Sequence, residues 1–197
     1  MQPLGMVRAA FHVYLVNLAV HLGMTGRFHI KPTFFREATR KDGAALTLIA
    51  QKTIGACYRN LLGVEKLVEV LESGAINEYI MENLGNSYCP IQLLDREPIG
   101  FAICRENIID WFIVDYRYHR RGIGAQLLAH CESEMFQAYP ELALSCFEKY
   151  EPANRFFRKH GWMEVMTHRD EQIDLRTILY QKLWRDTKKK SDELPRF

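Results

Sequence analysis

The chain has 197 residues, of which 48% are hydrophobic and 25% charged, and its formal net charge is +2. This composition is typical of a globular protein, and the length favours one domain with a sizeable core. The small net charge argues against a nucleic-acid partner, because such proteins normally carry a clustered basic face. The five cysteines lack C-x-x-C spacing. They argue against a zinc site or a disulfide framework and favour a reduced, cytoplasmic setting.

The two ends of the chain are set apart from the rest by their composition. Ala9–Leu22 is mainly apolar, but it is too short to span a bilayer and no clear cleavage site follows it. We interpret residues 1–32 as an N-terminal extension, with a docking or targeting helix as the alternative. Residues 186–197 are predicted to be a polar tail. The domain is expected to occupy residues 33–185, without a membrane span.

The hydrophobic pattern predicts strands and helices in a mixed order. Apolar runs bounded by turn residues indicate strands, and apolar residues three and four positions apart indicate helices. The expected strands are Phe34–Thr39, Ile91–Leu94, Ile99–Cys104, Ile108–Val114, Leu142–Phe147, Trp162–Thr167 and Thr177–Trp184. The expected helices run from Leu46 to Cys57, from Val64 to Leu71, over a turn or two at Ile76–Leu84, from Gly124 to Met135, and from Pro152 to His160.

The turn after the fourth strand carries the most informative pattern. Ile108–Val114 runs into a basic turn with Gly122 and Gly124, and a helix begins at once. The first turn of a helix holds unpaired N–H groups at the positive end of the macrodipole. The glycines lack the Cβ atoms that would keep a ligand from these amides, and Arg120 and Arg121 add positive charge. This combination predicts a phosphate or pyrophosphate site, with a plain helix-entry turn as the alternative.

The spacing of the turn selects among nucleotide-binding patterns. Leu127 stands where a dinucleotide-binding fold needs a third glycine, and no Lys-Ser or Lys-Thr follows for a P-loop. What remains, His119–Gly124, resembles motif A of the GNAT acyltransferases, [Q/R]-x-x-G-x-[G/A]. The segment Glu148–Trp162 is similar to that family's later pattern, roughly N-x-x-A-x-x-F-Y-x-x-x-G-F. The resemblance covers about residues 33–185.

The resemblance implies an α/β (α+β) fold with a mixed, mostly antiparallel central sheet, flanking helices and a splayed cofactor cleft. It implies an N-acetyltransferase that uses acetyl-CoA as co-substrate and needs no metal. The acetyl group would move to a primary amine of a small molecule, peptide or protein by direct attack in a ternary complex. A non-catalytic acetyl-CoA sensor is the alternative, and an acetylating toxin or a modifier of charged tRNA or ribosomal protein is a third. A homodimer stays open.

The same resemblance assigns the cofactor site. Amides of the glycine turn would hold the pyrophosphate, and the strand backbone would pair with the pantetheine arm. The cofactor-binding residues are therefore expected to be Phe112, Ile113, Val114, Arg120, Arg121, Gly122, Ile123, Gly124, Ala125 and Phe157.

Two residues are candidates for catalysis. Asp110 is the expected general base, because a carboxylate on an apolar strand is costly unless it is paired, hydrated or used in chemistry. By strand alternation it would share a face with Phe112, and a structural role in the sheet is the alternative. Phe157 stands where the family often has a tyrosine acid. Tyr150 is the candidate to supply that hydroxyl, although a thiolate leaves readily without an acid. Cys146 and His160 are interpreted as core residues.

Overall fold

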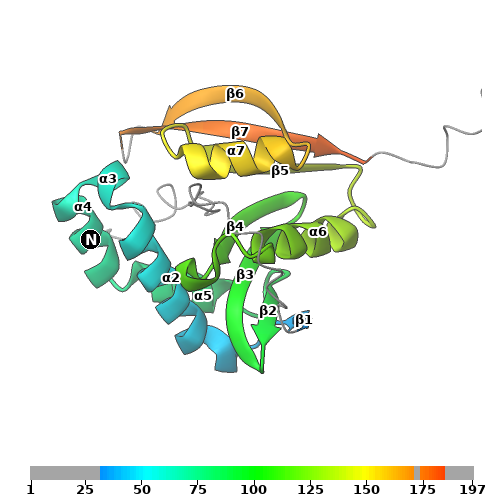
Figure 1. Cartoon of the computed structure of the whole chain (residues 1–197), viewed down its shortest axis with the longest axis horizontal. Coiled ribbons are helices and arrows are strands. Elements are labelled where there is room, and N and C mark those ends of the chain that lie inside the picture. Colours follow the sequence, from blue (N-terminus) through cyan, green and yellow to red (C-terminus); the bar gives the residue numbers. More distant parts are fainter. Residues whose placement is uncertain (1–31, 171–173, 185–197) are drawn as a thin grey trace, which may run out of the picture.

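A computed structural model of the chain describes residues 32–170 and 174–184. Within these ranges, seven strands form one sheet in the order β1-β2-β3-β4-β5-β7-β6, and only the β4–β5 pair is parallel. The strands are β1 (Phe34–Glu37), β2 (Pro90–Leu94), β3 (Glu97–Arg105), β4 (Ile108–Val114), β5 (Glu141–Phe147), β6 (Met163–Asp170) and β7 (Leu175–Leu183). The predicted mixed, mostly antiparallel sheet is confirmed (Figure 1).

Helices pack against both halves of this sheet. They are η1 (Arg40–Asp42), α2 (Gly43–Cys57), α3 (Arg59–Leu62), α4 (Val64–Glu72), α5 (Ala75–Asn83), η2 (Tyr116–Tyr118), α6 (Ile123–Met135) and α7 (Glu151–Lys159). In Figure 1, β3 and β4 lie between α2 and α5 on one side and α6 on the other. Trp111 of β4 stacks on Tyr79 of α5, with ring centroids 5.0 Å apart. On the other half, Phe157 of α7 packs against Tyr180 of β7.

The predicted apolar faces of α6 and α7 are confirmed. In α7, Pro152 occupies the first turn, where its missing N–H removes no helical hydrogen bond. Gly161, with φ 81°, follows the end of the helix in the conformation expected of a C-terminal glycine. The residues that these helices bury are Ile123, Gly124, Leu127, Leu128, Cys131, Met135, Ala153, Asn154, Phe156 and Phe157.

Some boundaries differ from the sequence prediction. A short helix, α3, precedes α4 and ends at Gly63, whose φ of 77° breaks the helical path. β6 continues to Asp170 and β7 begins at Leu175, so the hairpin is longer than predicted. Met163 to Arg169 are all exposed. No apolar alternation therefore marks where β6 ends, which is why the sequence pattern stopped short.

The parallel strands β4 and β5 separate along their length. In the described part of the chain they pair at one position, Ile108 with Ala143. β5 nevertheless continues to pair with β7 as far as Phe147. The carboxyl half of β4 therefore has β3 on one side and an unpaired edge on the other, and the expected splayed sheet is present.

Parts of the sequence prediction fall outside the described residues. The expected N-terminal extension over residues 1–32 lies outside them apart from Pro32, and so does the expected polar tail over 186–197. None of the helices in the described ranges is long and apolar enough to cross a membrane. Across residues 32–170 and 174–184, no group of three His, Cys, Asp or Glu side chains is placed to hold a metal ion.

Candidate active site

The glycine turn forms the N-terminus of α6 as the sequence predicted. Gly122 is the residue before the helix and has φ 80°, a left-handed conformation that favours glycine. The first bond from the helix to this residue runs from Gln126 N–H to the Gly122 carbonyl, 3.1 Å. The N–H groups of Ile123, Gly124 and Ala125 precede that bond, so the helix itself gives them no acceptor. With the macrodipole, they form a site for an anion.

The arginines of the basic turn have different surroundings. Arg117 is engaged by Asp115, with Nη2 2.6 Å from Oδ2, so its charge is compensated within the protein. Arg120 and Arg121 are both exposed beside the helix N-terminus. The Arg121 guanidinium lies 5.7 Å from the ring centre of Tyr118, which limits its freedom. The predicted arginines therefore lie as exposed side chains beside the amides of the helix N-terminus.

The separation of β4 from β5 leaves an opening between the two strands, narrow at the Ile108–Ala143 pair and wide at their carboxyl ends. The unpaired edge of β4 presents backbone groups to this opening. Asp115 N–H bonds to the Ile99 carbonyl of β3, and backbone groups alternate sides along an antiparallel strand. The backbone N–H and C=O groups of Ile113 therefore face β3. Those of Phe112 and Val114 face the opening. His119 Nε2 already lies 2.8 Å from the Val114 carbonyl oxygen, so this nitrogen carries a proton. Burial lowers the pKa of His119, which favours the neutral ring.

Residues of α7 close one side of the opening. Phe157 is fully buried, and its ring lies 6.2 Å from that of Phe112 on β4. It also packs on Trp162, so it is a core residue next to the β4 edge. Phe157 has no hydroxyl, and the hydroxyl of the neighbouring Tyr180 is engaged by Asn154 and Glu164. The expected tyrosine acid is therefore missing from a position that does adjoin the opening.

Tyr150 lies at the wide end of the opening. It immediately precedes α7, three residues after β5 ends at Phe147. Its hydroxyl hydrogen-bonds with the Cys57 thiol at the end of α2, and its ring meets that of Tyr58 at 5.2 Å. Burial raises the pKa of Tyr150 well above its ordinary value, so the phenol keeps its proton.

Asp110 lies near the narrow end, two residues from the Ile108–Ala143 pair. It is the extra residue of a β-bulge, because Ile103 pairs with Trp111 while Cys104 pairs with Ile109. The prediction that the Asp110 and Phe112 side chains share one face of β4 is therefore wrong. Asp110 hydrogen-bonds with the Tyr79 hydroxyl of α5, the residue on which Trp111 stacks. Phe112 instead faces α7.

The Asp110 carboxylate is fully buried and paired. The Tyr79 hydroxyl donates to its Oδ2. The Arg105 guanidinium at the end of β3 also reaches that oxygen, with Nη2 at 2.7 Å. Burial raises the pKa of Asp110 to about 7, while the two donors favour the charged form. A carboxyl group that titrates near neutrality is suited to accept a proton from an amine.

The structure thus brings most of the predicted residues together but separates the two catalytic candidates. Asp110 bonds to α5 and β3, whereas Tyr150 bonds to α2 at the other end of the opening. Sequence reasoning missed Tyr79 and Arg105, because a tyrosine on an apolar helix face and an arginine at a strand end are both ordinary. Tyr58 was missed for the same reason. No local pattern links these residues to Asp110 or Tyr150.

Of the two residues that the sequence assigned to the core, Cys146 lies in it, whereas His160 is half-buried. Cys146 is fully buried, and burial raises the pKa of its thiol far above the ordinary value. His160 ends α7, and its Nδ1 lies 2.8 Å from the Phe156 carbonyl. Its ring also lies 4.2 Å from the Phe156 ring. Neither side chain therefore contributes to the opening.

The N-terminus of α6 therefore lies beside the separating parallel strands β4 and β5. The family model for the acetyltransferase (GNAT) domain matches residues 56–183. The chain belongs to the GNAT acetyltransferase family. Among curated proteins, this GNAT chain is 29% identical over 90 residues to an uncharacterized N-acetyltransferase, YafP, of Escherichia coli strain K12. That match covers 46% of this chain and 55% of YafP, so the chain spans about half the length of the relative.

Solved structures show the same fold. A GCN5-related N-acetyltransferase from Rhodopseudomonas palustris superposes with a TM-score of 0.69 at 19% identity. The superposition covers 81% of this GNAT chain and all of the other. PaiA N-acetyltransferase from Thermoplasma acidophilum, solved in complex with coenzyme A, gives 0.67 at 16% identity. It covers 78% of this chain and all of PaiA. At these identities the likeness supports the fold alone.

Proposed function

We propose that this GNAT protein transfers an acetyl group from acetyl-CoA to a primary amine. The observation that carries the proposal is the unpaired edge of β4, which leads directly to the free amides of α6. Phe112 and Val114 would pair with the amide groups of the pantetheine arm, as an added strand pairs with a sheet edge. The amides of Ile123 to Ala125, with Arg120 and Arg121, would hold the pyrophosphate. PaiA, which shares this fold, was solved in complex with coenzyme A, which supports a coenzyme A thioester as the acetyl donor.

Asp110 is the group that we assign to the acceptor. An acceptor ammonium would give one proton to Asp110 Oδ2, which frees the nitrogen lone pair. The nitrogen would then form a C–N bond with the thioester carbonyl carbon, and the C–S bond would break with its electron pair on sulfur. The second proton would leave the nitrogen for the thiolate or for water. Placement of both reactants in one cleft would supply much of the acceleration.

The leaving thiolate receives no phenol from α7 at the family position, because that residue is Phe157. Tyr150 carries a phenol, but it lies at the wide end of the opening, where its hydroxyl bonds to the Cys57 thiol of α2. We therefore propose that Tyr150 lies beside the pantetheine arm of the cofactor. The coenzyme A thiolate would then leave without being protonated by a dedicated acid. A thiolate is stable enough for this, since thiol pKa values lie far below those of amines or alcohols.

The missing hydroxyl at Phe157 also favours a second candidate function. A GNAT chain that binds acetyl-CoA without turnover would act as a sensor of that metabolite. In that case the buried Asp110 would only complete the hydrogen-bonding of the β-bulge and its ion pair.

The experiment that separates the two functions is an amine screen that follows thiol release from acetyl-CoA. Small amines, amino acids and peptides would each be offered to the parent protein and to Asp110→Asn. An enzyme releases thiol with at least one amine, and the Asp110→Asn variant is roughly 10²-fold slower. Calorimetry should give both proteins the same acetyl-CoA affinity. Tight binding without thiol release for any amine would support the sensor, and no binding would reject both functions.

A further inference from the structure

The described sheet ends at β6, whose outer edge is long and apolar. In the described residues β6 pairs with β7 alone, from Met163 to Asp170, and Figure 1 shows it as the outermost strand. Three apolar side chains of this strand, those of Met163, Val165 and Met166, are 49%, 50% and 53% exposed. The edge strand at the other end of the sheet, β1, has only four residues. Proteins usually shorten, charge or cover an edge, so the edge of β6 has the features of a surface that pairs with another strand.

The face of β6 that is turned away from α7 is also apolar. Glu164 pairs with Tyr180 and binds Arg158 of α7, so its side chain lies on the α7 face. Met166 pairs with the next residue of β7, Leu179, and therefore lies on the opposite face. The exposed or half-buried apolar side chains on that face are those of Met163, Met166, Leu179 and Leu183. A molecule that pairs with the edge would also cover part of this face.

The charges of β6 match those of a second β6 strand in antiparallel order. Val165 is an extra residue, because the register with β7 shifts between Glu164 and Met166. When Thr167 of one copy lies opposite Thr167 of another, this extra residue places Glu164 of each copy opposite Arg169 of the other. Both of these side chains lie on the α7 face, so they can meet. Two-fold symmetry forms this contact twice.

Charge and apolar burial have different roles in such a contact. Glu164 and Arg169 already have partners in their own chain, Arg158 and Asp174, at the surface. Exposed ion pairs add little affinity, so the pairs between copies would mainly fix the register. The free energy of association would come from the apolar side chains that leave water.

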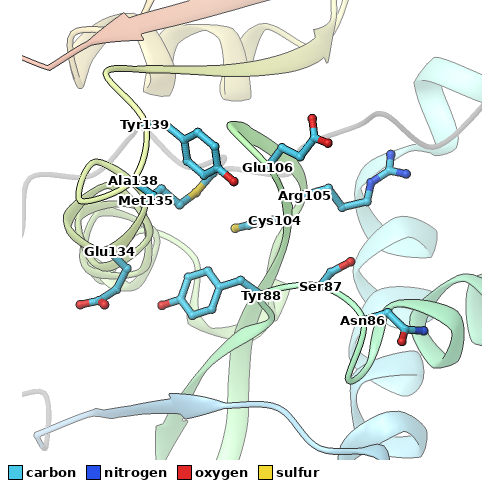
Figure 2. Close-up of a pocket in the computed structure, with 10 residues that line it drawn as sticks. All are labelled: Asn86, Ser87, Tyr88, Cys104, Arg105, Glu106, Glu134, Met135, Ala138 and Tyr139. Carbon is cyan, nitrogen blue, oxygen red and sulfur yellow. The ribbon is translucent and has the colours of Figure 1, made fainter.

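A second surface that a copy could use is the pocket between the β3–β4 turn and the end of α6. This pocket has a volume of about 570 Å³. Figure 2 shows Glu106 and Glu134 on opposite sides of it. A symmetric contact over the pocket would bring the like charges of two copies together, which opposes binding. The β6 edge therefore fits a second copy better.

We propose that two copies of this chain form a dimer in which their β6 strands pair antiparallel about a two-fold axis at Thr167. The two seven-stranded sheets are then continuous across the axis. The inference goes beyond the proposed acetyl transfer and does not depend on it, because β7 and β5 separate β6 from the β4 edge. Each copy therefore keeps its own cofactor opening.

Sedimentation velocity of the full chain over a range of concentrations tests the dimer. The parent should reach twice the 23.0 kDa of one chain. Met166→Lys puts a charge on the paired edge and should raise the dimer Kd by about 100-fold or more. Phe34→Lys is the matched control, because Phe34 is an exposed apolar residue of the edge strand at the other end of the sheet. It should dimerise like the parent.

Charge reversal on the same instrument tests the register. Arg169→Glu places a like charge opposite Glu164 of the second copy and should raise the dimer Kd by about tenfold. Glu134→Lys is its control, because it changes a charge at the pocket of Figure 2 and not at β6. It should leave the dimer unchanged.

A disulfide locates the axis. Directly opposed residues of antiparallel strands have Cα atoms about 4.5–5.5 Å apart, which a disulfide can span. With oxidised glutathione, Thr167→Cys should therefore give a covalent dimer. His168→Cys should not, because an offset of two residues puts its two Cα atoms about 8 Å apart. The parent, with its five native cysteines, gives the background.

A parent that keeps the mass of one chain at every concentration would overturn the proposal. So would a dimer that Met166→Lys leaves intact, or a covalent dimer formed by His168→Cys and not by Thr167→Cys. Weakening by Glu134→Lys would place the contact at the pocket instead. Thermal melting shows whether each variant is folded, and if Met166→Lys is not, Arg169→Glu repeats the comparison at a side chain that is 65% exposed. An intact dimer that does not bind acetyl-CoA would reject the proposed function and leave the interface standing.

Discussion

The assignment of the pyrophosphate to the α6 N-terminus predicts different effects for two very similar glycine substitutions. Gly122 precedes α6 with φ 80° and ψ −3°, and Gly74 precedes α5 with φ 79° and ψ −13°. A Cβ atom added at either position meets nothing within 4 Å. The two sites therefore present the same backbone strain and the same free space to an alanine. They differ in that only Gly122 lies next to the proposed phosphate cradle.

Alanine in the left-handed region costs about 1–2 kcal/mol, and its stiffer unfolded chain returns about 0.4–1 kcal/mol. Gly122→Ala and Gly74→Ala should therefore each lower the free energy of unfolding by about 1 kcal/mol, or about 2–4 °C in melting temperature for a domain of this size. Only Gly122→Ala should weaken acetyl-CoA binding, by about tenfold or more, because its methyl group keeps phosphate from the amides.

Melting curves and titration calorimetry with acetyl-CoA measure both quantities on the same samples. The Gly74→Ala protein is the control for the loss of stability, so a change in affinity cannot be blamed on partial unfolding. If Gly122→Ala binds acetyl-CoA as tightly as Gly74→Ala does, the pyrophosphate does not lie at the α6 N-terminus. Equal weakening in both variants would refute the reasoning in another way, since it would trace the effect to stability alone.

Three further predictions concern single residues. Because burial raises the pKa of Asp110 to about 7, the rate of thiol release should fall as the pH drops below that value and should level off above it. A flat rate profile from pH 6 to 9 would contradict the role of Asp110 as a base. His119→Gln retains an N–H for the Val114 carbonyl and should bind acetyl-CoA within about twofold of the parent, whereas His119→Leu should bind several-fold more weakly by calorimetry. Tyr150→Phe should cost about 1 kcal/mol in denaturant unfolding through its lost bond to Cys57. Its turnover should fall less than about threefold, and a tenfold loss would restore Tyr150 as the acid.

The sequence predicted the elements that repeat a pattern and missed those that depend on packing. The buried face of α6 could be predicted because Leu127, Leu128 and Cys131 follow helical spacing. The glycine turn could be predicted because its two glycines stand at fixed positions. The true end of β6 was not readable, because its residues are exposed and follow no apolar alternation.

The surroundings of Asp110 could not be predicted for a different reason. A β-bulge leaves no mark in the sequence of β4, and it turned the side chain toward α5 instead of the face of Phe112. Tyr79 comes from a segment 31 residues away, and its meeting with Asp110 is set by how α5 packs on the sheet. The cofactor side was predictable because its key groups are backbone amides placed by local turn geometry. The acceptor side was not, because it is assembled from distant side chains.

The single pairing of β4 with β5 has a consequence for how the protein opens. In the described residues, strands β1–β4 with α2–α6 share one strand pair, Ile108 with Ala143, with the unit of strands β5–β7 and α7. Side chains make further contacts between the two units: Glu132 of α6 pairs with Lys182 of β7 at 2.7 Å, and Phe112 of β4 packs on Phe157 of α7. Across the wide end they are also joined by Tyr58, whose ring meets those of Phe147 and Tyr150. Without a ligand, the smaller unit should open as a separate cooperative segment, with faster amide hydrogen exchange in β5 and β7. A ligand that pairs with the β4 edge would join the two units, and at about 100 times its Kd would add about 2.7 kcal/mol to their stability.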